Sequence, residues 1–432
     1  MTHPVRRSRA LRGGIVIALA TGVMNLATYA FTLISARRLG PADYGAFAAM
    51  LGLVIVVNVV SLGLQATGAR RVAEEPGDRQ VIEERVMTAS RQVGAVLTIA
   101  CLAATPVVAS VLGLDSLLTA GLLAVPAWCF AVMGGQAGIL QGEGRWVPLA
   151  LVFASLGLAR VVLGTVAIAA SPTSLAAMAG GVAAAAVVPV VVGAVALRHT
   201  RRRPSPGATR VASGRTHDGV LREALASSHA LLAFFVLATV DIVVARIVLD
   251  EHDAGLYAAG LIVVKAVQFL PQFVVVVAFP AMARRRGDRR LHLWGLAIIL
   301  ALGSVVTLAT AAVSDRVLAL VGGPQYADVQ ALLWVFAVVG TLLAAVQLLV
   351  YSALAQRQRG AVTAVWAAVG VVVLGSRAVG TGAQLLELVV AADALLLCAL
   401  LILTRREVVA DGAGGPDQPA VPGSTSPATA PA

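Results

Sequence analysis

The amino-acid sequence predicts an all-α, polytopic membrane protein with about 12 transmembrane helices, in two six-helix bundles related by a parallel pseudo-repeat. Three observations lead to this fold class: a composition too apolar for a water-exposed surface, long apolar runs, and basic loops that alternate along the chain. Of the 432 residues, 59% are hydrophobic and 13% are charged, whereas a soluble domain carries about 25% charged residues. The chain therefore lacks the polar side chains to cover itself in water.

The apolar runs are long enough to cross a bilayer, since roughly 20 helical residues at about 1.5 Å each span a hydrocarbon core of about 30 Å. The first run follows MTHPVRRSRALRGG and is too long for a signal-peptide core. Tight turns are expected at LDS (114–116) and GTG (380–382). Loop signals and charge clusters place the spans at 14–35, 46–69, 93–113, 117–140, 148–170, 175–197, 225–248, 256–279, 292–313, 327–350, 361–379 and 383–403.

Basic residues alternate between the two sides of this predicted bundle. With the N-terminus in the cytoplasm, 26 of the 33 basic residues fall in inside segments, and only Arg37, Arg38 and Arg316 fall in outside loops. Arginine and lysine concentrate in cytoplasmic loops, so the even helix count and the orientation support each other, and both termini are expected to be cytoplasmic. The net charge of +11 is divided among separate short loops, which does not favour nucleic-acid binding.

One short stretch recurs half a chain apart. LGPADYGAFAAM (39–50) and LDEHDAGLYAAG (249–260) are offset by 210 residues and share a leucine, an aspartate, a glycine and two alanines. Each is the expected external turn between the first and second helix of a six-helix half, although such matches also arise by chance in so apolar a chain. The expected segments are a cytoplasmic N-terminus (1–13), a first bundle (14–197), a cytoplasmic linker (198–224), a second bundle (225–403) and a disordered cytoplasmic tail (404–432).

Two regions of the chain resemble a known family. ARRLGPADYGAFAAMLGL (36–53) with SLGLQATGARRVA (61–73), and DIVVARIVLDEHDAGLYAAGLIVVKAVQFLPQFVVVVAFPAMARR (241–285), are similar to stretches of polysaccharide-exporting flippases of the Wzx type. These flippases belong to the multidrug/oligosaccharidyl-lipid/polysaccharide exporter (MOP) superfamily. The resemblance implies two six-helix bundles around a V-shaped central cavity, open to each side in turn, and translocation of a lipid-linked glycan without bond chemistry.

Ionisable side chains within the spans are the candidate cavity residues. A charge at the centre of a membrane helix costs roughly 2.5–3.5 kcal/mol and normally faces a partner or water. Asp241 and Lys265 lie at similar depth on the seventh and eighth spans, so an ion pair between them is sterically natural. Such a pair is either a gate or coupling site, or a static clip that neutralises two buried charges. Gln268 and Gln272 follow Lys265 at i+3 and i+7 and extend a polar face.

Further charges lie at mid-depth and at the outer mouth. Arg160 is the best candidate for a headgroup contact, because a guanidinium can hold a phosphate with two hydrogen bonds. Pairing with Asp393 and passive lining of the cavity are the alternatives for Arg160. Four residues belong to the outer mouth. Of these, Arg37 and Arg38 either hold a diphosphate or, as we favour, snorkel to lipid headgroups, and Arg377 and Glu387 flank the last external turn as a rim pair.

The sequence and the resemblance favour a flippase that translocates a lipid-linked oligosaccharide or polysaccharide precursor across the cytoplasmic membrane of a bacterium by alternating access. Its expected partners are a polyprenyl-diphosphate-linked glycan, membrane lipid and other glycan-assembly proteins.

The alternative is a multidrug and toxin extrusion-type cation antiporter, but the first span holds no Asp or Glu, unlike such exporters. A membrane glycosyltransferase would need a larger outer loop than residues 314–326, whereas a non-transporting scaffold stays compatible with the sequence. No catalytic constellation, cofactor motif or metal-ligand spacing is present, so we expect neither an enzyme nor a metal site.

Reporter fusions test the orientation. A reporter inserted within residues 198–222 should be located in the cytoplasm, because this arginine-rich connection obeys the positive-inside rule only there. A second reporter placed within residues 314–326 should be external. Alkaline phosphatase and fluorescent-protein activities measure the two locations, and the reverse pattern would contradict the assignment.

Overall fold

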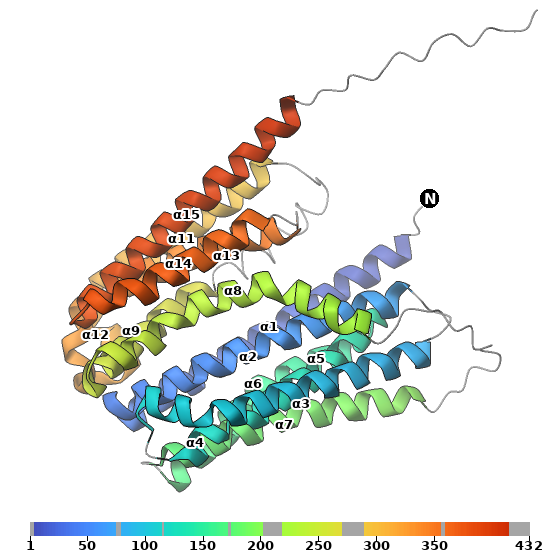
Figure 1. The fold of residues 1–432 in the computed structure, drawn as a ribbon, viewed down its shortest axis with the longest axis horizontal. Helices are drawn as coiled ribbons and strands as arrows, with labels where there is room; N and C mark the ends of the chain where they lie inside the picture. Colours follow the sequence, from blue (N-terminus) through green and yellow to red (C-terminus); the bar gives the residue numbers. More distant parts are fainter. Residues whose placement is uncertain are drawn as a thin grey trace, which may run out of the picture.

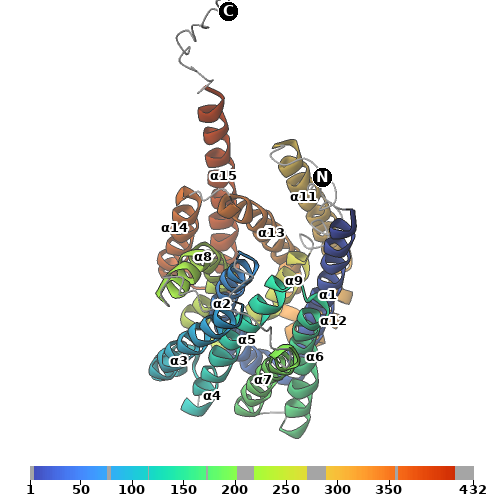
Figure 2. The ribbon, with the colours of Figure 1, turned by 90° about the vertical axis from the view of Figure 1, so that its right-hand side faces the viewer.

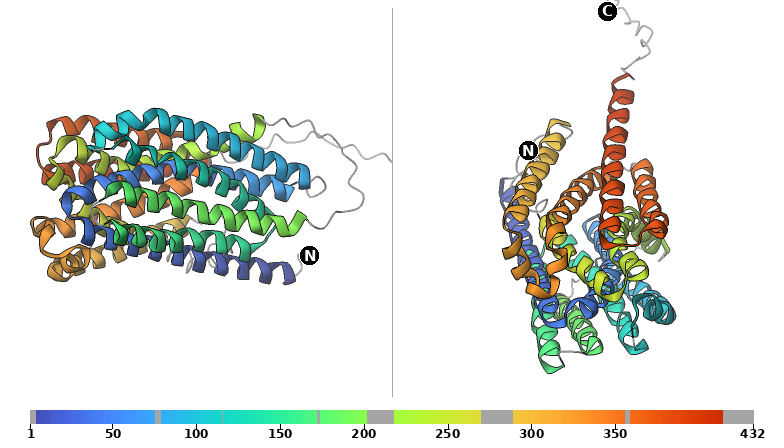
Figure 3. Two further views of the ribbon diagram at one scale, coloured as in Figure 1. Left: turned by 90° about the horizontal axis from the view of Figure 1, so that it is seen from below. Right: turned by 90° about the vertical axis from the view of Figure 1, so that its left-hand side faces the viewer.

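The computed structural model describes residues 4–74, 79–114, 116–171, 174–201, 218–269, 289–355 and 359–413. Within these residues all regular structure is helical, which confirms the predicted all-α class (Figure 1). Figure 3 shows most helices running in nearly the same direction, so that they form two ends of the molecule. We call the end at which α1 begins the basic side, and the end at which α1 turns into α2 the turn side.

The helices of the first half form one lobe. Its centre is the contact of α2 with α5; α1 packs on α6, α6 on α7, and α3 on α5. The elements are α1 (Pro4–Leu39), α2 (Pro41–Glu74), α3 (Arg79–Leu112), the short α4 (Leu117–Gly121), α5 (Ala124–Gly142), α6 (Trp146–Ala170) and α7 (Leu175–Arg201).

The helices of the second half form the other lobe, and Figure 2 shows its helices α11, α13, α14 and α15 above those of the first lobe. Here α13 occupies the central place and contacts α9, α11 and α15, while α14 packs on α8 and α15. The elements are α8 (Asp218–Val248), α9 (Glu251–Gln268), α11 (Arg289–Ala312), α12 (Ser314–Val321), η2 (Gly323–Leu332), α13 (Leu333–Ala355), α14 (Arg359–Gly375), η3 (Ser376–Ala378) and α15 (Gly382–Ala413).

By length and composition, 11 stretches of the described chain qualify as membrane-spanning. The predicted span that is missing from this set is 256–279. The helix that begins this span, α9, has only 18 residues and includes three charged side chains, Glu251, Asp253 and Lys265, so it is too polar to qualify by composition. Residues 270–288 lie outside the described part of the chain. The other predicted spans each coincide with a qualifying stretch, so the chain is a polytopic membrane protein.

Several helices extend beyond the predicted spans. α3 begins at Arg79, well before the predicted start at 93, because the intervening RQVIEERVMTAS is rich in good helix formers. α15 continues to Ala413, ten residues into the segment that we expected to be disordered, and residues 414–432 lie outside the described part. Most of the expected linker, 202–217, also lies outside it, and α8 begins at Asp218.

The two recurrent turns pack against each other. Each connects the first two helices of its lobe: Gly40, with φ of +75°, joins α1 to α2, and Asp250 caps the start of α9 by accepting a hydrogen bond from the N–H of Asp253 at 2.8 Å. Across the lobe boundary, a Cβ on Gly45 would lie 3.0 Å from Cα of Gly255, and a Cβ on Gly255 would overlap the carbonyl of Pro41. Both matching glycines are therefore required by one backbone contact between α2 and α9.

Within the first lobe, α2 and α5 also pack at backbone distance. Gly134, Gly138 and Gly142 follow at i, i+4 and i+8 on α5 and face α2. A Cβ on Gly138 would lie 2.7 Å from the carbonyl oxygen of Gln65, and one on Gly142 would lie 2.7 Å from that of Ala69. Small residues at this spacing are typical of tight helix pairs in membranes, where van der Waals packing replaces the hydrophobic drive.

This contact predicts a position-specific loss of stability. Gly138→Val should destabilise the first lobe, because overpacking costs about 1–3 kcal/mol and here the neighbour is backbone that cannot rotate away. Thermal unfolding of the purified protein in detergent measures the effect. The control is Gly180→Val on α7, where an added Cβ meets nothing within 4 Å, and equal melting temperatures for the two variants would contradict the packing argument.

Candidate functional site

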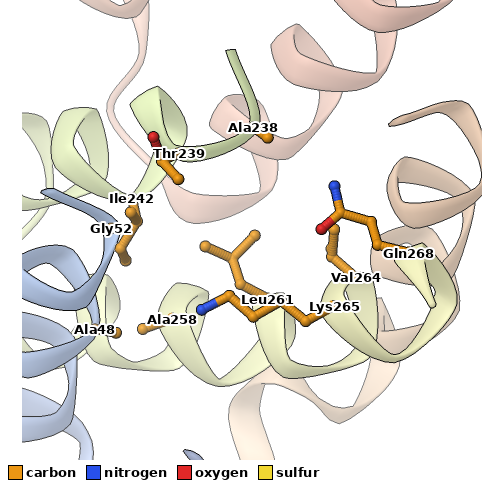
Figure 4. A pocket seen from close by; sticks show the side chains of 10 residues that line it. All are labelled: Ala48, Gly52, Ala238, Thr239, Ile242, Ala258, Leu261, Val264, Lys265 and Gln268. Atoms are coloured by element: carbon orange, nitrogen blue, oxygen red, sulfur yellow. The ribbon is translucent and has the colours of Figure 1, made fainter. Parts of the chain in front are cut away.

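A small pocket lies at the boundary between the lobes. Three helices line it: α2 contributes small residues from the first lobe, and α8 and α9 contribute the rest (Figure 4). Lys265 and Gln268, two residues that the sequence singled out, are in its wall. The lining residues are Ala48, Gly52, Ala238, Thr239, Ile242, Ala258, Leu261, Val264, Lys265 and Gln268.

The polar part of this wall comes from one face of α9. Lys265 and Gln268 are three residues apart and therefore neighbours on the helix surface. In Figure 4 the amine of Lys265 extends along α9 towards Ala258 and Ala48, so it lies where the two lobes meet. Gln272, the third predicted member of the face, lies outside the described part of the chain.

Asp241 lies behind this wall, on α8, with 3% of its surface exposed. One carboxylate oxygen accepts a hydrogen bond from the N–H of Ile242 at 2.8 Å, and the other accepts one from the hydroxyl of Tyr257 at 3.4 Å. Lys265 interacts with Asp241 electrostatically, yet the ion pairs of 4.0 Å or less among the described residues do not include these two. The carboxylate is therefore held by α8 and by Tyr257, with the ammonium as a more distant counter-charge.

Asp393 is a second buried carboxylate in the same lobe. It lies on α15 with 1% exposure, and its Oδ2 has no hydrogen-bond partner in the described structure. It interacts electrostatically with both Asp241 and Tyr257. Helices α8, α9 and α15 thus bring two carboxylates and one hydroxyl together, with the single positive charge of Lys265 nearby.

Arg160 approaches from the first lobe, on α6. Its Nε is buried and has no hydrogen-bond partner in the described structure, and its charge interacts with that of Lys265. No ion pair within 4.0 Å joins Arg160 to Asp393 in the part of the chain that is described. The structure therefore places two cationic groups, one from each lobe, close enough to repel each other.

This arrangement has two chemical capacities. An anion between Arg160 and Lys265 would relieve the repulsion of the two cations, and a guanidinium favours a phosphate that accepts two hydrogen bonds. On the other side, Asp241 and Asp393 share Lys265 as the cation of their own lobe, so a proton or a monovalent cation would offset their charge whenever Lys265 pairs with an anion.

The predicted outer-mouth residues have different surroundings. Arg37 donates hydrogen bonds to two carbonyl groups of α12, which is neither of the two roles that we considered for it. Arg38 is exposed. Arg377 in η3 and Glu387 on α15 are both exposed, and among the described residues no ion pair within 4.0 Å joins them. Their rim pairing stays a prediction.

Sequence reasoning assigned no role to Tyr257 or Arg246, and the structure shows a hydrogen-bonded partner for each. Tyr257 donates a hydrogen bond to Asp241, and its place within the recurrent stretch 249–260 gave no indication of this role. Arg246 donates to the carbonyl of Leu112, and no side-chain pattern could indicate a partner that is a backbone atom 134 residues away.

Comparison with known families gives one match for the sequence. The family model described as polysaccharide biosynthesis protein matches residues 10–286. This range contains the first lobe except for the first residues of α1, and the second lobe as far as α9. No curated protein sequence matches the chain.

Comparison with solved structures gives matches along almost the whole chain. The inward-facing conformation of a multidrug resistance MATE family transporter of the MOP superfamily is 15% identical, with a TM-score of 0.71 over 91% of this chain and 98% of that one. The outward-facing conformation of a MATE family transporter of the same superfamily is 16% identical, with a TM-score of 0.59 over 93% and 96%. The eukaryotic MATE transporter AtDTX14 is 14% identical, with a TM-score of 0.59 over 92% and 96%. These likenesses establish the fold.

Proposed function

We propose a transport function for this chain, which belongs to the polysaccharide biosynthesis protein family. It is a flippase that carries a lipid-linked oligosaccharide or polysaccharide precursor across the cytoplasmic membrane, and it makes and breaks no covalent bond. Family membership over residues 10–286 is the observation that carries this proposal. The MATE-like fold, with a pocket at the boundary of two lobes, supports it.

The physical task of such a flippase is to keep the charged, sugar-bearing headgroup in water while its polyprenyl tail stays in lipid. A path between two lobes suits this task, because the tail can remain outside the protein between helices while the headgroup passes through a wet crevice. The basic side would face the cytoplasm, as the distribution of arginine favours. Alternate opening of the two sides then moves the headgroup without a continuous pore.

Arg160 and Lys265 are the proposed headgroup contacts. They come from opposite lobes, they interact as like charges, and Arg160 has a buried N–H without a partner among the described residues. A diphosphate between them would satisfy both groups and join the lobes through the cargo. The polyprenyl-diphosphate-linked glycan is therefore the substrate class that we propose, with other glycan-assembly proteins as partners that deliver or receive it.

Asp241 and Asp393 are the proposed coupling carboxylates. Both are buried in the second lobe, they repel each other, and Lys265 supplies only one positive charge. When Lys265 engages an anionic headgroup, the carboxylates lose part of its compensation. Uptake of a proton or a monovalent cation would then become favourable, and this links cargo binding to an ion gradient.

A cation antiporter is the second candidate, because the solved structures of similar fold are MATE transporters. Two features disfavour it. The first span, Gly13–Leu39, contains no Asp or Glu, and the pocket wall at the lobe boundary carries an ammonium group that would repel a cationic drug.

Gene deletion followed by analysis of glycans separates these two functions. Loss of the flippase should reduce surface glycan and leave polyprenyl-linked precursor on the cytoplasmic side, as measured by lipid extraction and protection from external enzymes. Normal surface glycan together with new sensitivity to cationic dyes would identify an antiporter instead.

Substitution of Arg160 tests the headgroup site. Arg160→Gln should weaken binding of a polyprenyl diphosphate about tenfold or more, since a hydrogen bond to a charged group contributes about 1.5–3 kcal/mol. Binding to the purified protein in nanodiscs measures this loss directly. Asp241→Asn is the matched comparison: it should impair export in cells without weakening diphosphate binding, because it leaves both proposed cationic contacts in place. Equal affinity of Arg160→Gln and the unmodified protein would contradict the assignment.

A further inference from the structure

The turn side of the lobe boundary is held by hydrogen bonds that the transport pocket does not explain. At the end of α1, Arg37 donates from Nε to the carbonyl of Leu320 at 3.0 Å and from Nη2 to that of Ala319 at 3.1 Å. Both carbonyls belong to the last turn of α12, where a helix has no partners of its own. Arg37 of the first lobe therefore caps a helix of the second lobe.

Arg246 makes the reverse connection. It lies near the end of α8, with only 4% of its side chain exposed, and it donates from Nε and Nη2 to the carbonyl of Leu112 at 3.2 and 2.7 Å. Leu112 is the last residue of α3. The Nη2 atom also lies 3.6 Å from Oε1 of Glu251. Arg246 of the second lobe therefore caps a helix of the first lobe.

The two caps are reciprocal, although their acceptor helices do not occupy the same place in the two lobes. α1 and α8 are the first helices of their lobes, α3 is the third helix of the first lobe, and α12 follows α11, the helix that comes after α9 in the described part of the second lobe. Each lobe thus uses an arginine at the end of its first helix to cap the C-terminus of a helix in the other lobe, on the turn side. A cationic side chain at a helix C-terminus is stabilised both by hydrogen bonds and by the helix dipole.

Other contacts close the same region. The hydroxyl of Tyr326 donates to the carbonyl of Ala36 at 2.8 Å, and the rings of Tyr44 and Tyr326 pack edge to face with centroids 6.4 Å apart. The backbone contact of Gly45 with Gly255 lies in the same seam. These contacts join α1 and α2 to η2 and α9, so the turn side is closed by polar links that surround a close backbone contact.

We propose that Arg37 and Arg246 are the positioning residues of an outer gate, which keeps the turn side closed by reciprocal helix capping and opens only when both caps release. The inference rests on the proposed transport function, since a gate has meaning only for a protein that opens on both sides. It adds to that function by assigning the closed state to two residues outside the pocket. Arg38, one residue away, makes none of these bonds in the described structure.

Distance measurements between spin labels test the gate without any substrate. One label replaces Leu117, exposed at the start of α4, and the other replaces Arg316, exposed on α12. The native Cys101, Cys129 and Cys398 are first replaced by alanine. In nanodiscs, Arg37→Gln combined with Arg246→Gln should raise the population of long distances about tenfold or more, since charge-assisted hydrogen bonds are lost at both caps.

Two further variants keep the result interpretable. Arg38→Gln removes the same charge from a neighbouring exposed position and should leave the distances unchanged. Gly255→Ala inserts a methyl group into the seam and should shift the distances in the same direction as loss of the caps, even if the buried Arg246 variant fails to fold. Melting temperatures separate opening of the gate from general unfolding.

The outcomes distinguish the gate from the proposed function. If the distances in the combined Arg37→Gln and Arg246→Gln variant and in Gly255→Ala match those in Arg38→Gln, the gate is refuted even where the unmodified protein exports glycan. If the distances lengthen while deletion of the gene leaves glycan export intact, the gate stands and the flippase proposal fails.

Discussion

The structure depends on one constraint: inside lipid, every polar backbone group and every charge must find its partner within the protein. Helices satisfy the hydrogen bonds of their own backbone, which accounts for the all-helical structure of the described chain. Helices can then associate only by close packing, because lipid is as apolar as leucine. The glycines of α5 against α2, and Gly45 against Gly255, are among the places where the backbones themselves touch.

The same constraint explains where polar groups were retained. Asp241, Asp393 and Lys265 are concentrated in the second lobe, whereas Arg160 is the embedded charge of the first lobe that interacts with this group. Their incomplete pairing is costly in a static structure. The proposed function accounts for this cost, since the missing partners are then the cargo at the boundary and a coupling ion in the second lobe.

Much of the fold was predictable, because hydropathy and arginine distribution report directly on the bilayer. Lys265 and Gln268 were also predictable as pocket residues, since helical spacing puts them on one polar face. The hydrogen-bond partner of Asp241 was not predictable: the sequence suggested an ion pair with Lys265, but the side chain that donates a hydrogen bond to it is Tyr257. The capping roles of Arg37 and Arg246 were beyond sequence reasoning, because their acceptors are backbone carbonyls that carry no sequence signal.

The exchange of caps has a consequence for how the chain is assembled during synthesis. The carbonyl of Leu112 lies 134 residues before its donor Arg246 in the sequence, and Arg37 lies 283 residues before its acceptor Leu320. The first lobe therefore leaves the ribosome and enters the membrane with the polar ends of its seam unmatched, and it is complete only when α8 and α12 arrive. A first lobe alone has no donor for the Leu112 carbonyl and no acceptors for Arg37, so closure of the turn side requires the synthesis of α12.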